Sequence, residues 1–65
     1  MENQETKEDN EIYREIIREA AIQDQIGNYY RADMLYRKGL DIAENENNSE
    51  RIRLFEHLIK LALNR

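Results

Sequence analysis

The chain has 65 residues, with 10 Lys and Arg against 14 Asp and Glu, no cysteine and a formal net charge of −4. A chain of this length forms one domain at most, and the acidic balance argues against nucleic acid, because phosphate contacts need clustered Lys and Arg. The lack of cysteine excludes disulfides and thiolate metal sites and fits a reducing, cytoplasmic location. No apolar run approaches the roughly 20 residues that span a bilayer, so we expect no membrane insertion.

Residues 1–9 are predicted to be a disordered acidic tail, because this stretch has no apolar residue after Met1. A helix is then predicted over residues 10–26, with Asp9 or Asn10 as its cap. Its apolar residues recur every three or four positions, which marks one helical face. That face consists of Ile12, Tyr13, Ile16, Ile17, Ala20 and Ala21.

Asp24 breaks the pattern of this first helix, because it falls on the apolar face one turn after Ala20. A carboxylate there must find a hydrogen-bond donor or reach water. We expect it to accept a hydrogen bond from a backbone or tyrosine donor near the following turn.

Gly27 and Asn28 are predicted to form the turn after the first helix, since glycine closes a helix in the left-handed conformation and asparagine caps the next one. A second helix is predicted over residues 29–44. Ala32 and Gly39 face inward on it, and such small residues let another helix approach closely. We name the set of Asp24, Gly27, Ala32 and Gly39 the structural turn of the chain.

Four apolar residues lie where polar ones are expected. Two are on the first helix and two on the second, each pair four positions apart on the side away from the predicted core. They define a second apolar patch, consisting of Ile22, Ile26, Tyr30 and Met34.

A polar loop follows, in which Asn47 with Glu50, or else Ser49, is predicted to cap a third helix over residues 49–64. The apolar residues of this helix cover an arc of roughly 200°, which is wider than one packing stripe needs. The whole pattern predicts an all-α domain over residues 10–65, an antiparallel up-down-up bundle of three helices. The wide arc of the third helix must be covered by the other helices, another subunit or a ligand segment.

No arrangement of residues typical of catalysis or metal binding is present. His57 is the single histidine, with no cysteine or second histidine to complete a metal site and no cysteine nucleophile to pair with. We therefore expect no enzyme activity, no metal and no cofactor, and we interpret His57 as a surface residue.

The turn region resembles the first helical hairpin of microtubule-interacting and trafficking (MIT) domains, which typically show an A-x3-D-x2-G-x-Y-x2-A-x3-Y pattern. The matching residues here are Ala20, Asp24, Gly27, Tyr29, Ala32 and Tyr36, with Gly39 following. His57-x2-Lys60 stands where such domains often have Tyr-x2-Arg, so that part of the match is partial. Tetratricopeptide repeats share the Gly-x4-Ala-x3-Tyr portion, which makes them the weaker resemblance.

The MIT resemblance implies a protein-interaction module that binds a short helical peptide, usually the tail of an ESCRT-III-type membrane-remodelling subunit, between the second and third helices. Lys38 would be the first choice for a charge at the rim of that groove and Arg31 the second. The groove would be lined by Leu35, Ile42, Leu54, Leu58 and Leu61.

The alternative interpretation is a small protein that self-associates as a homodimer, or that binds a regulator in the manner of a bacterial or phage antagonist. In either case the apolar arc of the third helix would be its interface.

Overall fold

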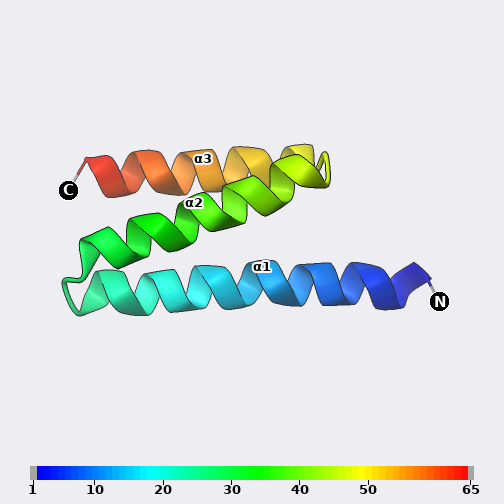
Figure 1. Ribbon diagram of the computed structural model, residues 1–65, viewed down its shortest axis with the longest axis horizontal. Coiled ribbons are helices and arrows are strands. Elements are labelled where there is room, and N and C mark those ends of the chain that lie inside the picture. Colours follow the sequence, from blue (N-terminus) through cyan, green and yellow to red (C-terminus); the bar gives the residue numbers. More distant parts are fainter. Residues whose placement is uncertain (1, 65) are drawn as a thin grey trace.

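The computed structural model describes the backbone of residues 2–64 and the side chains of residues 11–64. It contains three helices, α1 (Glu2–Gln25), α2 (Tyr29–Asn45) and α3 (Ser49–Leu63), and no strand among the described residues. The helices run up, down and up, so the predicted all-α three-helix bundle is confirmed (Figure 1). None of the described helices combines the length and the apolar character needed to cross a membrane.

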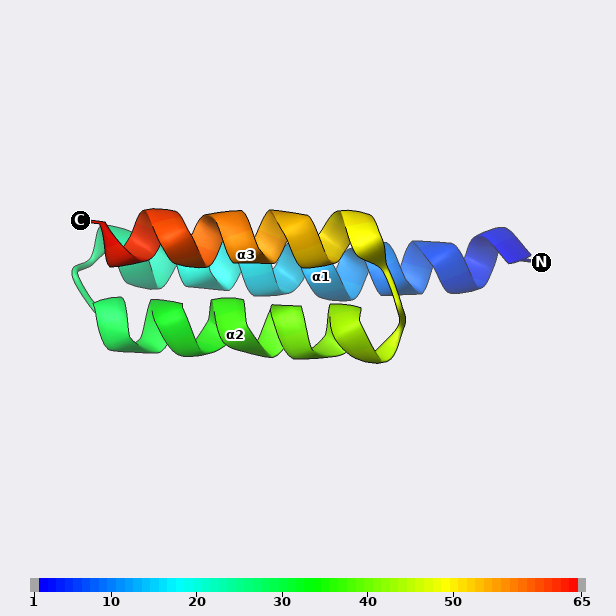
Figure 2. The same ribbon diagram turned by 90° about the horizontal axis from the view of Figure 1, so that it is seen from above.

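The helices form a shallow V rather than a closed triangle. α1 packs on α2 and α2 packs on α3, whereas the backbones of α1 and α3 do not contact each other. Viewed from above, α1 and α3 lie on the same side of α2 (Figure 2). Among the described helices, the backbone of α3 therefore contacts that of α2 alone.

α1 begins at Glu2, so helix occupies residues 2–9, where the sequence predicts a disordered tail. No glycine or proline precedes Gly27, and glutamates near a helix N-terminus interact favourably with the helix dipole. This first part of α1 projects past the ends of α2 and α3 (Figure 1). Met1, the first residue of the predicted tail, lies outside the described residues.

The turn between α1 and α2 is a Schellman motif. Gly27 has φ 87°, and its N–H donates to the carbonyl oxygen of Asp24 at 3.1 Å, while the Asn28 N–H donates to that of Gln23 at 2.8 Å. These bonds satisfy carbonyls that the end of α1 would otherwise leave unpaired. Asn28 then occupies the N-cap position of α2, although its side chain makes no capping hydrogen bond.

The turn between α2 and α3 repeats the same motif with asparagine in place of glycine. Asn47 has φ 55°, and the Asn48 N–H donates to the carbonyl oxygen of Ala43 at 2.9 Å. The cap of α3 is Asn48, whose Oδ1 accepts a hydrogen bond from the Arg51 N–H at 3.2 Å. The prediction of Asn47 or Ser49 as this cap was wrong, because Asn47 occupies the left-handed position and Ser49 already lies within the helix.

A small core joins the three helices, and the fully buried Phe55 of α3 lies at its centre. A Cβ added at Gly39 of α2 would clash with the Phe55 ring, so the glycine makes room for this phenylalanine. Ala32, one of the inward small residues, is also completely buried. The buried apolar residues are Tyr13, Ile16, Ala20, Ala32, Tyr36, Ala43, Phe55 and Ile59.

Tyr13 connects α1 to α3 and to the turn that precedes α3. Its ring centroid lies 5.8 Å from that of Phe55, and the guanidinium carbon of Arg51 lies 5.2 Å from the centre of the tyrosine ring. The buried tyrosine hydroxyl donates to Glu46 Oε1 at 2.6 Å. The side chain of Tyr13 therefore bridges α1 and α3, although the backbones of these two helices do not contact each other.

Candidate protein-interaction surfaces

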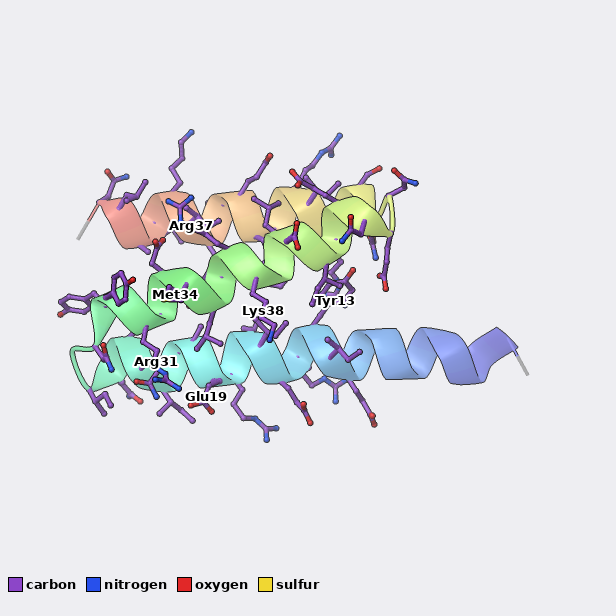
Figure 3. The ribbon with its side chains drawn as sticks, viewed as in Figure 1. Tyr13, Glu19, Arg31, Met34, Arg37 and Lys38 are labelled. Carbon is purple, nitrogen blue, oxygen red and sulfur yellow. The ribbon has the colours of Figure 1, made fainter. Side chains whose placement is uncertain are left out.

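The five residues predicted to line one groove are divided between two surfaces. Leu35 lines a hollow on α2 together with Arg31 and Lys38, and both cations lie on the side of α2 that faces α1 (Figure 3). Ile42 follows Leu35 after two helical turns, on the same side of α2, and is half-buried against the core. Leu35 and Ile42 therefore do not face the leucines of α3.

Leu54, Leu58 and Leu61 follow one flank of α3 at i, i+4 and i+7 spacing, and we name this surface the α3 flank. Leu54 and Leu58 are half-buried, whereas Leu61 is 54% exposed. A depression of about 200 Å³ lies beside its C-terminal part and is lined by Asp24, Tyr36, Leu58, Leu61 and Ala62. The α3 flank is thus an apolar strip next to the end of α1.

The second surface is a hollow of about 520 Å³ along α2, which we name the α2 hollow. Tyr30 and Met34 of the predicted second patch line it together with Arg31 and Lys38, the two cations predicted for the rim of a groove. Tyr30 is 79% exposed and Met34 is 53% exposed. The residues of the α2 hollow are Asn28, Tyr30, Arg31, Met34, Leu35 and Lys38.

The other half of the predicted second patch lies elsewhere. Ile22 and Ile26 are 44% and 69% exposed on α1 and do not line the α2 hollow. Helical phase places them opposite the buried Ala20, on the outer side of α1. The structure therefore brings Tyr30 and Met34 together but leaves Ile22 and Ile26 apart from them.

Asp24 is half-buried near the end of α1 and shares the lining of the depression beside the α3 flank with Tyr36. Its backbone carbonyl takes part in the Schellman motif. The expected hydrogen bond from a tyrosine or backbone donor to its carboxylate remains a prediction, and Tyr36, which lines the same depression, is a candidate donor.

His57 is exposed on α3 and lines a shallow depression of about 440 Å³ with Arg53, Glu56 and Lys60. Two of these neighbours are cationic, which does not favour a bound metal ion. Within the described part of the chain, no cluster of three or more His, Cys, Asp or Glu side chains is placed to hold one.

The hydrogen bond between Tyr13 and Glu46 is the feature that sequence reasoning missed. The two residues are 33 positions apart, and no periodicity connects them. One signal was available, because a tyrosine on a buried face needs a partner for its hydroxyl group. That signal predicts a partner but cannot name it.

Comparisons of the chain with protein-family models, with curated proteins and with solved structures gave no match. Function must therefore be argued from the two surfaces themselves.

Proposed function

We propose that the protein is a non-catalytic, cytoplasmic interaction module that binds a short helical segment of another protein along the α3 flank. The observation that carries this proposal is the apolar strip of Leu54, Leu58 and Leu61, which runs beside α1, a helix whose backbone does not contact that of α3. Apolar side chains at this spacing are typical of a surface that packs against a second helix.

The position of the strip supports a helix as the partner. The depression beside it is lined on one side by Leu58 and Leu61 and on the other by Asp24 of α1. Apolar anchors from a partner helix would cover the leucines, and Asp24 at the edge would favour a cationic or hydrogen-bonding residue beside them. By the MIT resemblance, an ESCRT-III-type tail is the first candidate to test.

The α3 flank also suits the alternative, in which a second copy of this chain covers it. Leu63, which is 69% exposed near the end of α3, adds apolar area at the same end of the molecule as Leu61. Sedimentation over a wide concentration range separates the two cases. A tight, concentration-dependent homodimer would occupy the strip and argue against peptide capture there.

For a monomeric chain, the test is an amide-shift titration with synthetic ESCRT-III-type helical tails. We expect the shifts to concentrate around Leu54, Leu58, Leu61 and Ala62. Leu61→Asp is the preferred variant, because Leu58 also packs against the core and its substitution would disturb folding. Binding that is unchanged in Leu61→Asp would contradict the proposal.

A further inference from the structure

The α2 hollow presents two positive charges that the fold does not neutralise. Arg31 and Lys38 are exposed and form no ion pair with any side chain among residues 11–64. Arg37, on the same helix, is instead held by Asp33, with Nε at 2.8 Å from Oδ2. In a chain of net charge −4, the hollow is therefore a local concentration of unpaired positive charge.

The start of α2 adds to this positive character. α2 has no acidic residue in its first turn, so the positive end of its dipole is not offset beside Asn28 and Tyr30. The Asn28 side-chain amide donates to Gln23 Oε1 at 3.1 Å rather than capping the helix. Glu19 of α1, labelled with Arg31 in Figure 3, accepts a hydrogen bond from Gln23 at 3.1 Å and forms no ion pair with the arginine.

Apolar surface lies between the two cations. Met34 and Leu35 fall between Arg31 and Lys38 along the helix, and Tyr30 stands beside them. The cations are seven positions apart (38 − 31), which is about 10.5 Å along an α-helix. A helix lying along α2 would match this surface if it carried two carboxylates two turns apart with apolar residues between them.

We propose that the α2 hollow is a second docking surface, distinct from the α3 flank, for an acidic amphipathic helix of another protein. Arg31 and Lys38 pair with the carboxylates of that helix, while Met34, Leu35 and Tyr30 cover its apolar side chains. Charge complementarity selects this occupant, because a basic or neutral helix would leave both cations unpaired.

The experiment is an amide-shift titration of the full chain with an alanine-based synthetic helix that carries two glutamates seven positions apart, with leucines between them. The matched control peptide has lysines in place of the glutamates. We expect the acidic peptide to shift the amides of residues 28–38 and its affinity to fall as salt is added. Failure of the acidic peptide to bind, or shifts confined to the α3 flank, would overturn the proposal.

Two double variants with the same change in charge make the test specific. Arg31→Glu with Lys38→Glu should weaken binding of the acidic peptide by about tenfold or more and should create affinity for the lysine peptide. Arg53→Glu with Lys60→Glu, on exposed positions of α3, should leave the acidic peptide bound nearly as well. Equal losses in both variants would show only a general effect of net charge and would contradict the proposal.

Sedimentation of the chain without peptide completes the design. Self-association that the Arg31→Glu, Lys38→Glu variant abolishes would identify a second copy as the occupant of the α2 hollow, which also overturns the proposal. Leu61→Asp should leave binding of the acidic peptide unchanged, so this inference and the function proposed for the α3 flank can fail independently.

Discussion

The two sides of α3 show how one helix serves different purposes. Phe55 and Ile59 face the interior, where Phe55 is fully buried between Gly39 and Tyr13. Leu54, Leu58 and Leu61 are equally apolar but line the α3 flank, where Leu58 is only half-buried against the core and Leu61 is 54% exposed. The difference teaches that the apolar residues of α3 range from Phe55, which the fold requires, to Leu61, which is mostly exposed. Variants of the two sides should therefore separate stability from binding.

Phe55→Ala should have the largest effect, because a buried phenylalanine truncated to alanine loses about 3–5 kcal/mol. A domain of 65 residues has a free energy of unfolding of only about 3–10 kcal/mol, so the variant should lose between about a third and all of it. Circular dichroism during urea titration measures the loss. The matched control is Leu61→Ala on the exposed side, and equal losses in the two variants would contradict the division of α3.

Tyr13→Phe should lower the free energy of unfolding by about 1–2 kcal/mol, because it removes a part-buried hydrogen bond to a carboxylate. The hydroxyl donates to Glu46 at 2.6 Å, while the ring packs on Phe55 in both forms. Urea unfolding of Tyr30→Phe, whose hydroxyl belongs to a residue that is 79% exposed, provides the control and should show no change. A Tyr13→Phe variant with an unchanged free energy of unfolding would show that this hydrogen bond does not stabilise the fold.

Gly39→Ala should destabilise the fold by up to about 2 kcal/mol. Alanine favours helix by about 1 kcal/mol over glycine, but its methyl group would clash with the buried Phe55 ring, and overpacking costs about 1–3 kcal/mol. Combining it with Phe55→Leu should recover part of the loss relative to the sum of the single variants. A more stable Gly39→Ala protein would mean that α2 and α3 are not in close contact here.

Gly27→Ala should cost about 1 kcal/mol for a different reason. Nothing lies within 4 Å of a Cβ at this position, so only the left-handed conformation at φ 87° opposes the change. Gly27→Asn should lose less in the same urea unfolding measurement, because asparagine occupies the matching position Asn47 in the second turn. Identical losses for alanine and asparagine would argue against the shared turn motif.

Leu61→Asp should have the smallest effect on the free energy of unfolding, within about 0.5 kcal/mol, because substitutions of exposed residues rarely exceed this range. Urea unfolding monitored by circular dichroism measures it. The variant should keep the helical spectrum of the parent protein, and a marked loss of helix would place Leu61 in the core.

The sequence predicts much of the fold because the signals involved are local. Gly27 and Asn28 specify a turn through their own conformational preferences, and the helical spacing of apolar residues identifies three helices. The second turn was harder to assign, since Asn47 and Asn48 can each cap a helix or adopt the left-handed conformation. The helical start at Glu2 differs from the prediction, because composition alone does not decide between helix and disorder for a charged segment.

The candidate surfaces depend on non-local information. A helical projection shows that Leu35 and Ile42 share one flank of α2, but it does not reveal whether α1 or α3 lies beside that flank. The groove predicted between α2 and α3 therefore combined residues that lie on two separate surfaces of the structure. The hollow that Tyr30 and Met34 share with Arg31 and Lys38 is, by contrast, lined by α2 and its N-cap Asn28 alone.

The most direct test of the α3 flank is an amide-shift titration of Leu61→Asp. The titrant is an ESCRT-III-type helical tail that shifts the amide resonances of the parent protein. We expect the shifts around Leu54, Leu58 and Ala62 to disappear, while the spectrum of the free variant remains that of a folded protein. Retention of those shifts at the parent affinity would contradict the assignment of the α3 flank as the binding surface.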